Sequence, residues 1–97
     1  MALSLILSFR CKETKKLAGG KFSRKLPSDI QRIAARKIKM IGDAVELIDL
    51  RVPPANRLEA LKGERKGQHS IRINDQWRIC FRWRNGNAMD VEIVDYH

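Results

Sequence analysis

The sequence predicts an α+β domain in which two N-terminal helices pack on one face of a small, mainly antiparallel β-sheet. The first half of the chain carries the apolar spacing of amphipathic helices, and the second half changes to the alternating pattern of strands separated by turn residues. Helices followed by hairpin-linked strands are typical of α+β domains. With 97 residues, 43% of them hydrophobic, the chain has enough apolar material for one core, so we expect a single domain over residues 1–97.

The N-terminal segment MALSLILSF is expected to form a strand. Apolar side chains alternate at Leu3, Leu5, Leu7 and Phe9. The segment has no basic start, a very short apolar core and no convincing cleavage site, which argues against a signal peptide. No stretch approaches the length of a membrane span.

Two helices are expected next. The segment CKETKKLAGG predicts a short helix that ends at its two glycines. Residues 28–50 carry the strongest helical signal, in which Ser28 or Asp29 can cap the start, Gly42-Asp43 can break the helix, and the following proline pair ends it. The apolar residues at i, i+3 and i+4 spacing are Ile30, Ile33, Ala34, Ile38 and Ile41.

Strands are predicted over residues 57–61, 68–73, 77–84 and 88–95. The last hairpin has two possible registers. A two-residue turn at Asn85-Gly86 would pair Arg82 with Met89 and place arginines among the apolar residues of the last strand. A three-residue loop instead pairs Arg82 with Asp90 and keeps one face apolar, so we predict this loop.

The same reasoning places a three-residue loop at 74–76. One face of the sheet is then predicted to be apolar and to carry the helices, with His69 on this side as a packed or edge histidine. The members of this face are Ile71, Ile73, Trp77, Ile79, Phe81, Trp83, Met89, Val91 and Ile93.

The other face is predicted to gather positive charge. Arg72 lies directly opposite Arg78, with Arg82 and Arg84 further along the same side and Tyr96 diagonal to Arg78. Like charges across a sheet are destabilising, and a bound anion would reverse that sign. Arginine pairs bind phosphate through bidentate, charge-assisted hydrogen bonds. An ordinary solvated face remains an equal alternative for Arg82 and Arg84.

The terminal residues Asp95, Tyr96 and His97 add groups that can bond or transfer protons beside these arginines. Together they supply the parts of a metal-free ribonuclease, in which a base takes the 2′-hydroxyl proton, the oxygen attacks the adjacent phosphate, cations hold the developing charge and an acid protonates the 5′ oxygen. A basic loop between two strands can contact the phosphate backbone. The expected RNA-binding residues are Lys62, Arg65, Lys66, Arg82 and Arg84.

The formal net charge of +9 indicates a polyanionic partner, either nucleic acid, an acidic protein or an anionic membrane surface. Positive charge is concentrated in residues 1–41 and 62–84. Cys11 and Cys80 are isolated and have no zinc-like spacing. We therefore expect a reduced, cytoplasmic protein with no metal and no cofactor.

The run NRLEALKGERKGQHSIRINDQWRICFRW, followed by VEIVDYH, resembles HigB-type toxins of the RelE superfamily, and in particular their GraT-like relatives. The resemblance begins at ILSF, so residues 1–5 are expected to be an N-terminal extension. It implies a RelE-like fold and a toxin of a type II toxin-antitoxin module that cuts mRNA in the ribosomal A site, next to 16S rRNA. It also implies a HigA-type helix-turn-helix antitoxin, through which alone operator DNA would be bound, and no membrane partner.

The resemblance assigns roles to individual residues. Where some HigB toxins have a histidine, this chain has Glu59, which can act as a base but cannot cover a phosphate as a cation. The cations would bind phosphate or transition-state charge, His97 or Glu59 would transfer protons, Tyr96 would orient the nucleotide and Asp95 would orient the terminal side chains. The expected catalytic residues are Glu59, Lys62, Arg72, Arg78, Asp95, Tyr96 and His97.

Two other functions compete with this one. ParE-like toxins share the scaffold but act on DNA gyrase and lack the catalytic set, so Arg72, Arg78, Tyr96 and His97 argue against that function. A basic RNA-binding module without catalysis would hold phosphates only electrostatically. Such a module would bind RNA and leave it whole.

Overall fold

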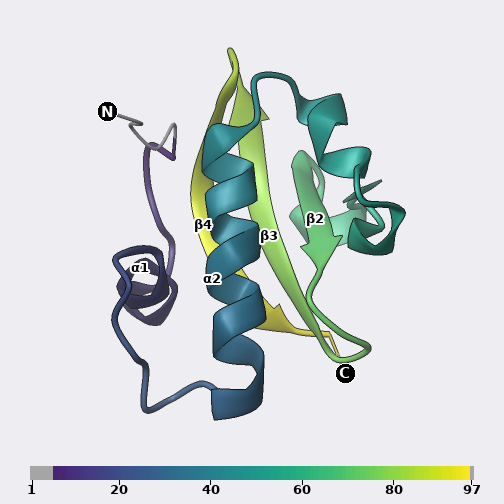
Figure 1. Ribbon diagram of the computed structural model, residues 1–97. Coiled ribbons are helices and arrows are strands. Elements are labelled where there is room, and N and C mark those ends of the chain that lie inside the picture. The colour runs from purple at the N-terminus through teal and green to yellow at the C-terminus, as the bar shows by residue number, and fades with distance from the viewer. Residues whose placement is uncertain (1–5, 97) are drawn as a thin grey trace.

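The computed structural model describes residues 6–96. The strands form an antiparallel sheet in the order β1-β2-β3-β4, which confirms the α+β class (Figure 1). The α-helices are α1 (Lys12–Ala18) and α2 (Ser28–Asp43). Short 3-10 helices are η1 (Leu47–Arg51), η2 (Pro54–Asn56) and η3 (Gly63–Arg65). The strands are β1 (Glu59–Ala60), β2 (Gln68–Arg72), β3 (Trp77–Arg84) and β4 (Asn87–Asp95).

Both predicted α-helices are present: α1 ends just before the two glycines, and α2 follows the apolar spacing. The start of α2 differs in detail. Pro27 precedes the helix, and within the described chain no side chain caps its first turn, so the predicted capping by Ser28 or Asp29 is wrong. The fixed φ of proline, here −56°, replaces the cap as the feature that starts the helix. The predicted break at Gly42-Asp43 is confirmed, because α2 ends at Asp43, Ala44 is extended, and only the short η1 lies between there and the proline pair.

The N-terminal segment pairs with β4 at isolated points. Ile6 forms a parallel bridge with Ala88, and Phe9 forms one with Val91, so within residues 6–9 the predicted strand is replaced by two isolated bridges. The side chain of Leu7 is exposed. The earlier part of the predicted strand, including the expected extension at residues 1–5, lies outside the described residues.

The β3–β4 hairpin combines parts of both registers. Ile79 faces Ile93 as predicted, but Arg82 faces Met89, so the turn has two residues and the predicted three-residue loop is wrong. The pairing register changes between the two ends of the ladder, at a β-bulge between Cys80 and Arg82. The bulge inserts one extra residue into β4, which reverses the alternation of its side chains beyond that point.

Asp90 shows how the bulge is accommodated. Its φ of +53° is left-handed, a region that Asp tolerates better than most residues. The N–H groups of Asp90 and Val91 bond to the side chain and the carbonyl of Ser8, at 2.9 and 3.2 Å. The N-terminal segment therefore satisfies donors that the bulge removes from the ladder.

Hydrophobic residues of the helices and the sheet form one core cluster. In Figure 1, α2 runs across the sheet in front of β3 and β4. The predicted apolar face is confirmed except at Met89, which the two-residue turn moves to the side of Arg82 and replaces with the fully buried Ala88. None of the helices within residues 6–96 has the length and apolar character needed to cross a membrane. Core members include Ile38, Ile41, Ile71, Ile79, Phe81 and Val91.

Candidate active site

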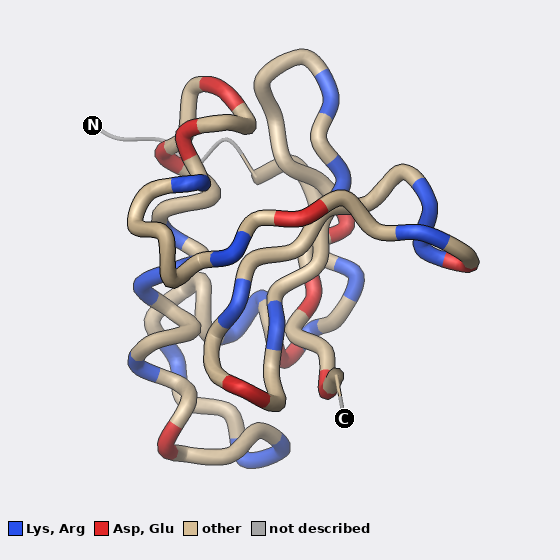
Figure 2. The backbone as a smooth tube through the Cα atoms, turned by 90° about the vertical axis from the view of Figure 1, so that its right-hand side faces the viewer, with Lys and Arg blue, Asp and Glu red and all other residues tan. Residues whose placement is uncertain are grey.

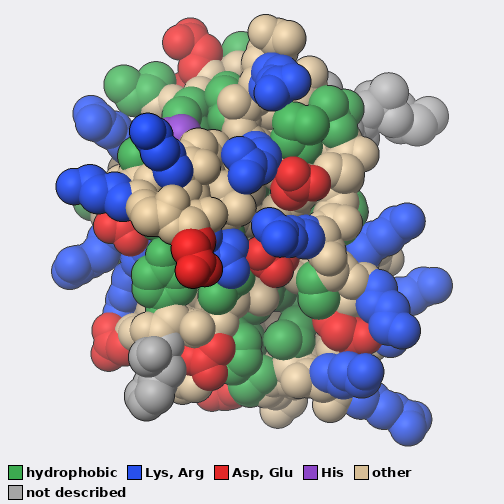
Figure 3. Space-filling model, turned by 180° about the vertical axis from the view of Figure 1, so that it is seen from behind, with side chains coloured by type: hydrophobic (Ala, Val, Ile, Leu, Met, Phe, Trp, Pro, Cys, Tyr) green, Lys and Arg blue, Asp and Glu red, His purple; other side chains and the backbone are tan. Residues whose placement is uncertain are grey.

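The face of the sheet that turns away from α2 is rich in charged side chains. Figure 3 shows the molecule from behind, with lysines and arginines gathered over this side and acidic side chains between them. The backbone view in Figure 2 shows that basic positions are spread over the helices as well as the strands. The alternation of β2 and β3 explains the polar face, since every second residue must point away from the core.

Arg78 lies on this polar face and has several partners. Its Nε donates to Ser70 Oγ at 2.8 Å, and its Nη2 donates to the carbonyl of Arg57, also at 2.8 Å. Arg57 presents that carbonyl from a left-handed conformation, with φ at +47°. The carboxylate of Glu59 lies 3.4 Å from Arg78 Nη2, and the ring of Tyr96 lies 5.7 Å from its guanidinium carbon. Only 11% of the Arg78 side chain is exposed, so its orientation is set by these partners.

Arg72 lies directly opposite Arg78 in the β2–β3 ladder, as predicted. Its contacts are different, because its guanidinium forms an ion pair with the exposed Asp75 in the following turn. The buried Lys37 of α2 donates to the carbonyl of Arg72 at 2.6 Å. Burial lowers the pKa of Lys37, and the nearby charges of Arg36, Arg72 and Arg78 act in the same direction. Three other cations therefore lie near Lys37 at this end of the sheet.

The C-terminal segment passes Arg78 at Tyr96. Trp77 faces Asp95 at the last rung of the β3–β4 ladder, and the N–H of Tyr96 donates to the carbonyl of Gln76 at 2.6 Å. The side-chain amide of Gln76 donates to Asp95 Oδ2 at 3.1 Å. Burial raises the pKa of the Tyr96 phenol. His97 lies outside the described residues.

The basic loop before β2 contributes one bridging residue. Arg65 Nη1 donates to Gln68 Oε1 and to Glu92 Oε1, both at 3.0 Å. The hydrogen bond that Arg65 donates to Glu92 raises the pKa of Arg65. Lys62 and Lys66, by contrast, have exposed side chains.

The remaining predicted residues are dispersed. Arg82 Nε lies 3.5 Å from Asp90 Oδ2, and Arg84 is exposed near the far turn. His69 packs on the apolar side, with its ring stacked 6.2 Å from that of Phe81, as predicted. Its Nδ1 is buried without a hydrogen-bond partner among the described residues, and burial lowers its pKa.

The structure adds residues to the site that sequence reasoning missed. Ser70 and Arg57 hold Arg78, Gln76 holds the terminal segment, and Lys37 reaches the site from α2. The alternation of β2 places Ser70 on the face of Arg72, so it was open to prediction. The other three act through backbone carbonyls or across turns, and residue patterns carry no signal for such contacts.

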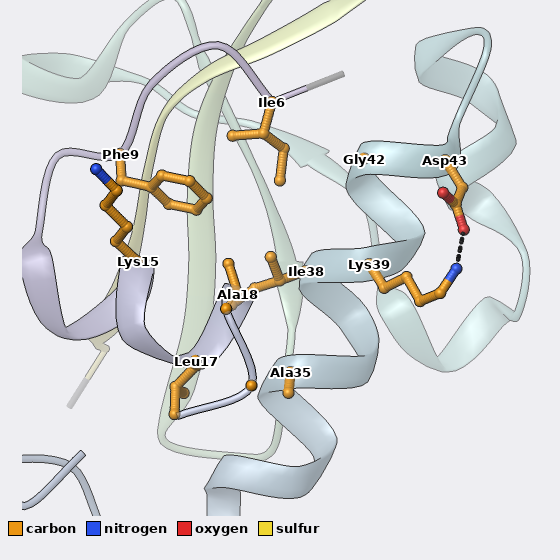
Figure 4. A pocket seen from close by; sticks show the side chains of 12 residues that line it. Ile6, Phe9, Lys15, Leu17, Ala18, Ala35, Ile38, Lys39, Gly42 and Asp43 are labelled. Atoms are coloured by element: carbon orange, nitrogen blue, oxygen red, sulfur yellow. Dashed lines mark hydrogen bonds and ion pairs between the residues drawn. The ribbon is translucent and has the colours of Figure 1, made fainter. Parts of the chain in front are cut away.

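A separate cavity of about 600 Å³ lies on the helix side, between the N-terminal segment, α1 and α2 (Figure 4). Its walls include Phe9, Leu17 and Ile38, and Lys39 at its border pairs with Asp43 at 2.9 Å. The described lining contains none of the predicted catalytic residues. The candidate site therefore belongs to the polar face of the sheet.

The fold and the polar face define a small, basic α+β protein with a largely buried arginine on the polar face of its sheet. Comparison with known families identifies it further, because the profile described as RelE-like toxin of type II toxin-antitoxin system HigB matches residues 7–97. The chain belongs to this HigB-like toxin family. Membership of a type II toxin-antitoxin family implies an antitoxin partner.

Three curated relatives are similar to this chain. Toxin HigB-1 of Vibrio cholerae is 43% identical over 67 residues, which cover 69% of this chain and 70% of the relative. An uncharacterized protein of Haemophilus influenzae is 39% identical over 73 residues, or 75% of this chain and 71% of the relative. Endoribonuclease HigB of Proteus vulgaris is 35% identical over 94 residues, or 96% of this chain and 100% of the relative.

Proposed function

We propose that this protein is the toxin of a type II toxin-antitoxin module and acts as a ribosome-dependent mRNA interferase that cuts the message in the A site. Family membership and the similarity to Endoribonuclease HigB support the activity. The observation that carries the proposal is the fixed position of Arg78 on the polar face, where Ser70, Glu59 and Tyr96 surround its guanidinium. A preorganised guanidinium is the group best suited to hold a phosphate as charge develops on it.

The proposed reaction uses these neighbours in defined roles. Arg78 and Lys62 bind the scissile phosphate, and a phosphate oxygen takes the place of the Glu59 carboxylate beside Arg78. Half of the Glu59 side chain is exposed, so this carboxylate is free to turn away. Glu59 and His97 are the proton-transfer groups, one for the 2′-hydroxyl and one for the departing 5′ oxygen.

The 2′ oxygen then bonds to phosphorus as the bond to the 5′ oxygen breaks. The products are a 2′,3′-cyclic phosphate and a 5′-hydroxyl. Arg72 contributes to binding of RNA or of transition-state charge, Tyr96 orients the nucleotide, and Asp95 orients the terminal side chains. Neither a metal nor a cofactor takes part in this scheme.

The proposal extends to architecture and partners. Residues 1–97 act as one toxin domain, with both helices on the apolar face so that the polar face is left for RNA. The basic positions of α1 and α2 contact 16S rRNA, and Lys66, Arg82 and Arg84 contact the RNA backbone electrostatically. The partner is a HigA-type helix-turn-helix antitoxin, operator DNA is bound only through the antitoxin complex, and the protein acts in the cytoplasm.

A reconstituted translation reaction tests this function. Wild-type protein is expected to generate new mRNA 3′ ends within the A-site codon, and Arg78→Lys to lower the cleavage rate by roughly 10²- to 10³-fold, because lysine keeps the charge but loses the planar fork. The matched control is Arg51→Lys, an exposed change on η1, which should cut like the wild type. RNA that is bound but left whole by the wild type would favour a non-catalytic RNA-binding module, and inhibition of gyrase supercoiling would favour a ParE-like toxin.

A further inference from the structure

The turn between β2 and β3 is held rigidly from within. Asn74 Oδ1 accepts hydrogen bonds from the N–H groups of Gln76 and Trp77, both at 2.8 Å. The N–H of Ile73 bonds to the carbonyl of Trp77 at 2.8 Å. An asparagine that bonds the backbone two and three residues ahead is a common way to fix a turn. These bonds therefore fix the position of the Gln76 backbone in the turn.

Gln76 contacts the end of β4. The β3–β4 ladder ends at the pair of Trp77 and Asp95, and two further hydrogen bonds continue past it. The carbonyl of Gln76 accepts the N–H of Tyr96, and the amide of Gln76 donates to the carboxylate of Asp95. One residue thus holds two consecutive residues of the terminal segment.

The contacts of Gln76 with the terminal segment affect the position of the Tyr96 ring beside Arg78. Chain ends normally fray beyond the last rung of a sheet unless something ties them down. Here the ring of Tyr96 lies against the guanidinium of Arg78, with 42% of the tyrosine still exposed. A small rotation of the segment about Asp95 would move the phenol away from Arg78, since the contact of Arg78 with Tyr96 is a ring contact without a fixed hydrogen bond.

We propose that Gln76 is a positioning residue that docks the C-terminal segment and thereby holds Tyr96 against Arg78. The inference rests on the proposed function for its catalytic consequence, because a displaced Tyr96 matters only if nucleotides bind there. The docking itself is a property of the folded chain and is measurable without RNA. Gln76 touches neither phosphate nor base in this arrangement, and it acts through Asp95 and Tyr96.

Two variants test the docking. Gln76→Ala removes the side-chain donor, and Gln76→Glu replaces the donor with a carboxylate that faces Asp95. Amide hydrogen exchange at neutral pH measures the protection of the Tyr96 N–H. Protection should be highest in the wild type, lower in Gln76→Ala and lowest in Gln76→Glu, because the new carboxylate of Gln76→Glu repels that of Asp95. The protection of core amides such as Ile79 should stay unchanged. Added salt should reduce the difference in Tyr96 N–H protection between the two variants, because it screens the repulsion between the carboxylates.

The same variants are then assayed for cleavage on programmed ribosomes. The cleavage kcat should fall by about ten- to a hundredfold with a smaller change in KM, as expected when a catalytic group is misplaced by a small distance. The control is Asn87→Ala, which also removes an amide side chain from a hairpin turn, at the far end of β3. Asn87→Ala should leave the Tyr96 protection and the cleavage rate as in the wild type.

Several results would overturn the inference. Unchanged protection of Tyr96 in both Gln76 variants would show that the segment is docked by other contacts. Reduced protection with an unchanged cleavage rate would show that Gln76 docks the segment without positioning a functional group. If the wild type itself fails to cut RNA, the proposed function fails, and the exchange data still decide whether Gln76 docks the terminal segment.

Discussion

The two faces of the sheet are built from the same strands and are held by different forces. On the side of α2, Ile71, Ile79 and Phe81 are fully buried against apolar neighbours. On the other side, Arg78 is almost as inaccessible, but its partners are a hydroxyl, a carbonyl, a carboxylate and an aromatic ring. Depth of burial alone therefore does not distinguish a core side chain from the one proposed to bind phosphate.

The difference teaches where stability and function are located in this fold. Removal of apolar surface from water is the dominant favourable contribution to folding, and close packing makes it sensitive to the loss of even a few atoms. Polar contacts exchange with water when the chain unfolds, so each adds little net stability. These polar contacts fix the orientation of a charged group such as the guanidinium of Arg78. Apolar packing cannot do this for a charged group.

The largest expected effect comes from breaking the apolar face. Phe81→Ala should lower the free energy of unfolding by about 3–5 kcal/mol, through lost transfer energy and a cavity at the centre of the core. Urea titration followed by tryptophan fluorescence measures the change. The fraction of the variant that remains folded should still cut RNA, because the Phe81 side chain packs on the apolar side, against the rings of His69 and Trp83. A cost below about 1 kcal/mol would mean that the core is less closely packed than the structure shows.

A smaller effect is expected from the polar face. Arg65→Met removes the bonds to Gln68 and Glu92 and should lower the free energy of unfolding by about 1 kcal/mol, as for a partly buried charged hydrogen bond. The matched control, Arg51→Met on η1, should stay within about 0.5 kcal/mol of the wild type. A loss from Arg65→Met as large as that from Phe81→Ala would contradict the proposed division between the two faces.

The smallest expected effect is the contribution of His69, on the apolar face, to the pH dependence of the free energy of unfolding. Burial lowers the pKa of His69 below 6.5 in the folded state, so the unfolded chain binds the proton more readily. Wild-type stability should therefore decrease as the pH falls through 6.5 and below, until the folded histidine is protonated as well. In His69→Phe, which keeps a ring against Phe81, this contribution should disappear. Urea midpoints of the two proteins between pH 5 and pH 8 measure the difference, and parallel curves would argue against a buried neutral His69.

The sequence predicted much of this arrangement where local rules apply. The two glycines located the end of α1, and the helical spacing located α2. Alternation placed Arg72 opposite Arg78 with Tyr96 nearby. The same alternation failed at Met89. The preference for an Asn-Gly turn and the preference for a continuous apolar face favoured different registers, and the chain satisfied both by inserting a bulge at Asp90. Such a compromise depends on Ser8, which is 82 residues away and satisfies the freed donors.

By itself, the sequence determined the class of fold, the location of most elements and the side of the sheet on which the arginines lie, because periodicity and turn preference act between near neighbours. Only the tertiary structure decided how each arginine is engaged. Arg72 pairs within its own turn, whereas Arg78 is held by residues from β1, β2, the C-terminal segment and the carbonyl of Arg57. The contacts of Arg78 with Glu59 and with the carbonyl of Arg57 depend on three-dimensional proximity between distant segments, and no local pattern of residue types encodes that proximity.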